Sequence, residues 1–188
     1  MLRTATLAII LCAGSAAAET FEIDAAHSSI SFRIRHIVAK VRGRFDAFSG
    51  SFDYTAGKPA TWKASAEIDA ASINTNEPKR DGHLRTADFF DVEKCPKIEF
   101  KSTRIANADG ATAELHGDLT MHCVTKPIVL KLEIGGVDGS KAGMTATGKL
   151  DRRQWGMTWN KANMLGDVID LEIELEGNAA AANEPRKG

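Results

Sequence analysis

Apolar and polar residues alternate along most of the chain, and this is the pattern of β-strands that bury one face. The first alternating run begins at Ser28, and one parity of it contains Ile30, Phe32, Ile34, His36 and Val38. We therefore expect a half-buried strand of unusual length over residues 28–38. The second run spans residues 41–54 and changes parity between Phe45 and Phe48, so a bulge is expected near Asp46–Ala47.

Six further alternating runs follow at residues 62–68, 98–102, 115–121, 128–134, 144–150 and 169–175, mostly separated by short turns. Eight such strands predict an all-β fold, an eight-stranded antiparallel up-and-down (lipocalin-like) barrel with one short helix between strands. A two-sheet sandwich stays open, because periodicity does not show closure. A barrel of eight strands can hold one small ligand.

Small residues occupy many of the expected inward positions. They are Gly43, Gly50, Ala64, Ala66, Gly117, Ala146 and Gly148. Because such residues leave volume that larger side chains would fill, they favour an internal cavity.

The strands are interrupted at residues 70–97, where we expect the chain's one helix, from about Asp81 to Val92. Arg80, Asp81 and His83 lie close together at its start. As a catalytic group, Asp81 would orient His83 as a general base while Arg80 held an oxyanion. As a structural group, Asp81 would cap the helix and Arg80 would pair with a carboxylate such as Asp88. We favour the structural interpretation and assign no catalytic residue, because no nucleophile lies in a recognised motif.

The two ends of the chain are expected to lie outside the folded domain. Residues 1–18 combine Arg3, an apolar run from Leu7 to Cys12 and a small-residue site, which is the pattern of a cleaved signal peptide. Residues 177–188 contain too few large apolar residues to fold and predict a disordered tail. The expected barrel domain is therefore 19–176, in an exported protein.

Charge and histidine spacing argue against two other classes of function. Loss of Arg3 with the signal peptide leaves 23 of the 24 basic side chains against 25 acidic ones, a net charge of −2. This balance argues against general nucleic-acid binding, which depends on phosphate neutralisation. The five histidines show no metal-ligand spacing, and no haem attachment motif is present, so we expect no metal site and no cofactor.

Cys95 and Cys123 remain after removal of the signal peptide, and an oxidising compartment favours a disulfide between them. The hairpin register that places Ile98 opposite Leu119 would instead start the two side chains on opposite faces. A break in the alternation at Pro96 would be needed for a bridge. The sequence leaves both outcomes open.

Several segments together resemble the YceI-like family over residues 21–176. They read IDAAHSSISFRIRH, VRGRFDAFSGSF, RDGHLRTADFFDVEKCP, GDLTMHCVTKPI and RRQWGM. The resemblance implies a lipocalin-type eight-stranded barrel, exported to the bacterial periplasm, that binds a polyisoprenoid or similar long amphiphile in an internal channel. Both cysteines depart from the family pattern, so a bridge would be peculiar to this chain.

The leading hypothesis is therefore a periplasmic carrier or scavenger of a long-chain isoprenoid or quinone-like amphiphile. From alternation and the resemblance, the residues expected to line its channel are Ile34, His36, Phe45, Phe52, Phe100, Leu119 and Leu132. One alternative is an enzyme acting on such a lipid through Arg80, Asp81 and His83. Another is a ligand-free module that supports a membrane cytochrome. Transient contact with membrane proteins and homodimerisation also stay open.

Overall fold

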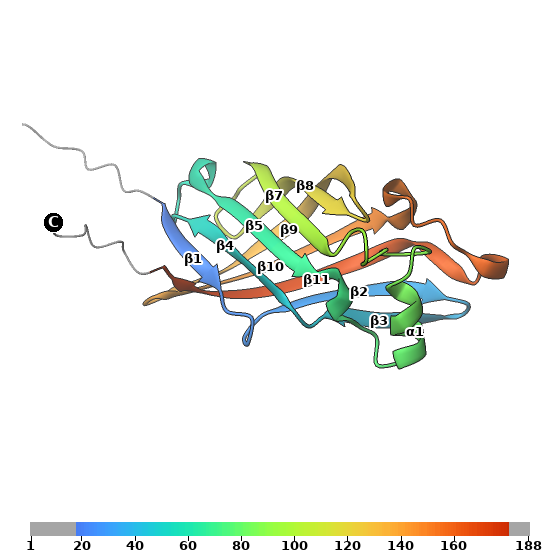
Figure 1. Cartoon of the computed structure of the whole chain (residues 1–188). Coiled ribbons are helices and arrows are strands. Elements are labelled where there is room, and N and C mark those ends of the chain that lie inside the picture. Colours follow the sequence, from blue (N-terminus) through green and yellow to red (C-terminus); the bar gives the residue numbers. More distant parts are fainter. Residues whose placement is uncertain (1–17, 181–188) are drawn as a thin grey trace, which may run out of the picture.

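Antiparallel strands make up most of residues 18–180, the part of the chain that this computed structural model describes (Figure 1). The first six strands are β1 (Glu19–Ile23), β2 (Ser29–His36), β3 (Ala39–Phe45), β4 (Phe48–Tyr54), β5 (Lys63–Asp69) and β6 (Ile73–Asn74). After helix α1 (Pro78–Leu84) come β7 (Lys97–Ala106), β8 (Thr112–Met121), β9 (Val124–Asp138), β10 (Lys141–Asp151) and β11 (Leu165–Ala179). Short 3-10 turns lie at Pro59–Thr61, Ala70–Ser72, Arg152–Trp155 and Lys161–Asn163.

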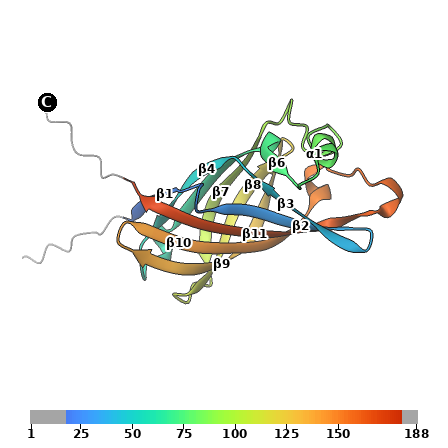
Figure 2. The same cartoon turned by 90° about the horizontal axis from the view of Figure 1, so that it is seen from below.

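The sheet closes on itself, which confirms the predicted eight-stranded barrel. Its ring runs β1-β4-β5-β7-β8-β9-β10-β11, and pairing of β1 with β11 closes it. The long β11 pairs with β2 through residues 165–174 and with β1 through residues 177–179. Strands β3 and β6 extend the wall beyond β2. Figure 2 shows these strands wrapped around a common interior.

Two expectations about the first strands were wrong. The long strand ends at His36, because Ile37 and Val38 form a two-residue turn into β3. Near Asp46–Ala47 the chain has a complete interruption between β3 and β4 in place of a bulge. The strand partners change there, since β3 pairs with β2 and β6, whereas β4 pairs with β1 and β5.

The helix is shorter and begins earlier than predicted. Pro78 occupies its first turn, and the Glu77 carboxylate accepts hydrogen bonds from the backbone N–H groups of Lys79 and Arg80. These are ordinary N-terminal features of a helix. After Leu84 the chain continues in turns, and Asp91 has a left-handed φ of 46°. Asp81 is therefore not the helix cap.

The C-terminal boundary also shifts. Strand β11 continues through Ala179, so residues 177–179 belong to the barrel and not to a tail. The expected signal peptide, apart from Ala18, and residues 181–188 lie outside the described residues.

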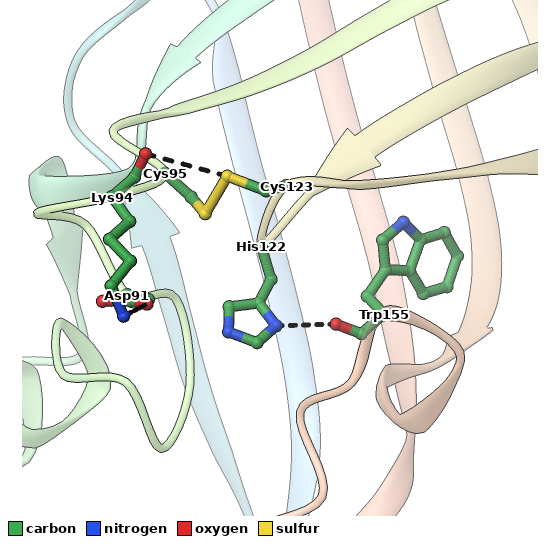
Figure 3. Close-up of a disulfide and its surroundings, with 6 residues drawn as sticks. All are labelled: Asp91, Lys94, Cys95, His122, Cys123 and Trp155. Carbon is green, nitrogen blue, oxygen red and sulfur yellow. Dashed lines mark hydrogen bonds and ion pairs between the residues drawn. A yellow bond between two sulfur atoms is a disulfide. The ribbon is translucent and has the colours of Figure 1, made fainter.

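A disulfide joins Cys95 to Cys123, with 5.4 Å between their Cα atoms (Figure 3). The true register pairs Phe100, not Ile98, with Leu119, and β7 begins only at Lys97. His122 and Cys123 both have left-handed φ angles, of 50° and 56°, in the turn between β8 and β9. These breaks in the alternation bring the two thiols together. His122 Nδ1 lies 2.8 Å from the Trp155 carbonyl oxygen, which ties the same turn to the segment after β10.

Three of the small inward residues, all glycines, play a different part from the one expected. A side chain at Gly43 would collide with the Phe32 ring at 2.3 Å, and one at Gly117 would collide with Phe100 at 2.4 Å. Leu130 similarly covers Gly148. These three glycines therefore accommodate neighbouring side chains and do not themselves leave open volume.

Among residues 18–180, no helix has the length and the apolar character needed to cross a membrane.

Candidate functional site: an apolar cavity inside the barrel

The barrel encloses a cavity of about 500 Å³ that runs along its interior. Its walls are almost entirely aliphatic and aromatic. The seven predicted residues all line it: Ile34, His36, Phe45, Phe52, Phe100, Leu119 and Leu132. Ala64, Ala66 and Ala146 also line it, so the alanines of the small-residue set do face the open volume. The cavity is therefore suited to an apolar, elongated guest.

The titratable groups of the cavity wall gather at one end. They are His36, Lys79, Arg80, His83 and Arg152, and the described lining contains no Asp or Glu. They come from the end of β2, from α1 and from the segment after β10, which Figures 1 and 2 place at the same end of the barrel. We call this the polar end. A head group with hydrogen-bond acceptors or negative charge would find its partners there.

Arg152 organises the polar end from within. Its side chain is 2% exposed and donates to the carbonyl oxygens of Gly166 and Trp159, each at 3.0 Å, and to that of Met157. It also donates to Asp167 at 3.0 Å. Burial lowers the pKa of the Arg152 guanidinium, and the negative charge of Asp167 opposes this shift. Arg152 thus fixes the loop between β10 and β11 against the barrel.

The suggested catalytic group is not assembled. Asp81 is buried and accepts from the backbone N–H of Thr75 at 2.9 Å and from its hydroxyl, so it does not orient His83. Arg80 does not pair with Asp88, because its guanidinium donates to the Thr75 hydroxyl at 2.7 Å and carbonyl at 2.8 Å. His83 instead contacts Asp88 at 2.8 Å. These residues shape the entry of β6 into α1.

Aromatic rings surround His83 where the polar end meets solvent. The imidazole meets Trp159 edge-on with ring centroids 4.8 Å apart, and Phe89 at 5.1 Å. Phe89 and Trp159 contact each other at 5.5 Å. All three line the cavity, so an amphiphile entering here would meet aromatic faces beside basic groups.

One group of three residues in the described chain has the spacing of metal ligands, namely Asp24, His27 and Glu176. Each already has a protein partner: Asp24 accepts from His27 and Asn178, and Glu176 pairs with Lys141. Hydrogen bonds lower the pKa of Asp24, with that from His27 contributing most.

Sequence reasoning missed the lining residues that come from outside the regular strands. They include Lys79, Leu84, Met157, Trp159 and Met164. The aromatic loop around Trp155 and Trp159 was visible in the sequence, but periodicity gives no direction for a side chain in a loop.

Comparison with known proteins gives a consistent result. The YceI-like domain model matches residues 21–177. A UPF0312 protein of Pseudomonas putida is 35% identical over 176 residues, which cover 89% of this chain and 91% of the relative. A crystal structure of a Campylobacter jejuni YCEI protein is 34% identical with a TM-score of 0.71, over 77% of this chain and 88% of that one. A structure described as a polyisoprenoid-binding domain from Saccharophagus degradans has a TM-score of 0.70 at 16% identity, over 87% and 99% of the two chains, and shows the likeness of fold.

The closed barrel, the internal apolar cavity and the match over almost all of the described residues agree with the resemblance seen in the sequence motifs. The chain belongs to the family of YceI-like domain proteins.

Proposed function

We propose that this protein binds a long-chain isoprenoid or a similar amphiphile inside the barrel and carries it through the periplasm. The observation that carries the proposal is the cavity of about 500 Å³ with an apolar wall and basic groups at one end only. The polyisoprenoid-binding description of the Saccharophagus degradans domain supports the same class of ligand. The signal-peptide pattern of residues 1–18 supports export.

The apolar chain supplies most of the binding free energy. Burial of a CH₂ group is worth about 0.8 kcal/mol, so twenty buried carbons give roughly 16 kcal/mol before the costs of ordering and association. One neutral hydrogen bond to a head group adds only about 0.5–1.5 kcal/mol. Affinity therefore follows chain length and the shape of the cavity, while the polar end orients the ligand. A quinone ring or a polyprenyl head group would lie beside His36, Arg80 and His83.

The binding role requires no covalent step, and the geometry favours it over catalysis. Asp81 holds Thr75, and Arg80 is committed to the same residue. His83 is left with Asp88 as its carboxylate partner. This pair lies at the surface and faces no second catalytic group.

Native mass spectrometry of the protein, isolated gently from cells without detergent, tests the proposal. We expect a bound mass that matches an isoprenoid lipid and that organic extraction removes. Re-addition of the lipid should restore the bound mass, in His83→Ala as in the wild type. A protein that carries no lipid and takes up none on addition would contradict the proposal, as would conversion of the lipid that depends on His83.

A further inference from the structure

The turn between β2 and β3 exposes two adjacent branched apolar side chains. Val38 is 96% exposed and Ile37 is 51% exposed. The other large apolar residues that are strongly exposed, Val129, Val137 and Val168, are 46–52% exposed and lie singly on strands. Single exposed apolar residues are ordinary, but an adjacent pair at the tip of a hairpin is not explained by packing within the chain.

The backbone conformation at the tip is unfavourable for Ile37. Ile37 has a φ of 55°, a region that β-branched residues rarely adopt. Two-residue hairpin loops with such an angle at the first position favour glycine. The turn is held from both sides, since the Ile37 N–H donates to the Met164 carbonyl at 2.7 Å and Arg35 donates to the Ile37 carbonyl at 3.0 Å. Residues that break a local rule in a well-held segment are characteristic of functional surfaces.

The two strands that carry the tip are basic. Residues 29–45 contain no Asp or Glu, and their cationic residues are Arg33, Arg35, Lys40, Arg42 and Arg44. Three of these pair with carboxylates, Arg33 with Glu172, Lys40 with Asp170 and Arg44 with Asp46. Within residues 18–180, Arg35 and Arg42 form no ion pair, and both are exposed. An apolar tip with adjacent cations complements the surface of a bilayer that contains anionic lipid.

The tip also belongs to the polar end of the cavity. Ile34, His36 and Val41, which line the cavity, come from the same two strands that meet at the tip. Figures 1 and 2 both show the β2–β3 hairpin reaching the end of the barrel that carries α1. A surface that held Ile37 and Val38 would therefore lie next to the basic groups of the cavity.

We infer that the Ile37–Val38 tip inserts into the interface of an anionic membrane and brings the polar end of the cavity to the lipid surface. The inference rests on the proposed function, which gives membrane docking its role: a water-insoluble ligand has to pass between the membrane and the barrel. Docking itself needs no bound ligand, so the two can fail separately.

Vesicle flotation of the full mature chain tests the inference. The probes are mixed phosphatidylglycerol–phosphatidylcholine vesicles and vesicles of phosphatidylcholine alone. We expect the wild type to bind the mixed vesicles and to lose much of this binding in high salt. The double variant I37G/V38S places glycine at the left-handed position, so it should fold at least as well as the wild type while binding the vesicles about tenfold or more weakly. The control Val129→Ser removes from β9 an apolar side chain that is exposed to about the same extent as Ile37, and it should bind as the wild type does.

The charge variant R35Q/R42Q should lose the preference for phosphatidylglycerol while keeping the fold. Wild-type protein that fails to bind the mixed vesicles, or I37G/V38S that binds them as well as the wild type, would overturn the inference. Isoprenoid added from ethanol separates the two proposals, because I37G/V38S should bind it with unchanged affinity. If the wild type docks through the tip but binds no isoprenoid, the docking inference stands and the proposed function fails.

Discussion

At the end of the barrel that carries β1, aromatic rings pack against one another, whereas at the polar end loops and a short helix surround basic groups. Phe21 is fully buried and stacks on Phe52 with ring centroids 5.4 Å apart, and the Trp62 indole donates to the Thr55 carbonyl at 2.7 Å. At the polar end, α1 and the loop anchored by Arg152 line the cavity, and the disulfide joins the segment before β7 to the turn between β8 and β9. The contrast indicates that stability and ligand exchange depend on different parts of the molecule.

Truncation of a ring at each end gives the largest expected difference. Phe21→Ala should lower the free energy of unfolding by about 3–5 kcal/mol, because it removes a fully buried ring that does not line the cavity. Trp159→Ala should cost less stability, since that side chain is only half-buried, but should weaken lipid binding. Urea unfolding and lipid titration measure the two effects. Equal loss of stability in both variants would contradict the separation of roles.

Removal of the disulfide tests the polar end alone. C95S/C123S should lower the free energy of unfolding by up to about 3.6 kcal/mol, the chain-entropy value for a closed loop of this length. Hydrogen exchange should rise in residues 85–96 and in the turn at His122, because the bond joins these segments. Dithiothreitol should reproduce the effect in the wild type and leave the double variant unchanged. A variant as stable as the wild type would show that the bond adds nothing to the polar end.

The smallest effect concerns an ion cluster in which Asp170 of β11 pairs with Lys40, near the tip of the β2–β3 hairpin, and with Lys149 of β10. Hydrogen bonds from Lys149 and Lys40 lower the pKa of Asp170 to about 2. A carboxyl group with a lowered pKa stabilises the fold above its unfolded pKa, near 3.8, and this contribution is lost as the pH falls toward 2. Asp170→Asn should therefore cost about 0.5–1 kcal/mol at neutral pH and little at pH 2. Urea unfolding at both pH values checks this, and a cost that does not depend on pH would contradict it.

The sequence predicted the barrel because alternation marks a strand wherever one face is buried. The seven cavity residues lie on such strands, and parity alone directs their side chains inward. The hairpin turn at Ile37–Val38 was not predicted, because neither residue is typical of a turn. The alternation of apolar and polar residues also continues through the turn, so it gives no sign that the strand ends. The helix was predicted too late in the chain, because the prediction relied on the apolar run after Asp81. Glu77 and Pro78, which start the helix, precede that run.

The polar end could be predicted only in part. Arg80 and His83 drew attention by their chemistry, but their partners depend on Thr75 and on the turn at Asp88, which come from the tertiary fold. The disulfide depended on the left-handed turn at His122 and Cys123, which alternation along the strands does not predict. An inward glycine in the sequence is compatible either with open volume or with a neighbouring side chain that fills the volume. Only the positions of Phe32 and Phe100 in the structure show that the space beside Gly43 and Gly117 is filled.

A chain-length series tests the central claim most directly. Isoprenoid alcohols of increasing length are titrated into the lipid-free protein and into Ala146→Phe, which adds a ring to the cavity wall, with Thr147→Phe as the outward-facing control on β10. We predict that wild-type affinity rises with each added isoprene unit until the cavity is full and then levels off. The plateau should fall at a shorter chain in Ala146→Phe and stay unchanged in Thr147→Phe. Affinity that is independent of chain length, or a plateau that Ala146→Phe does not shift, would contradict a ligand held inside the barrel.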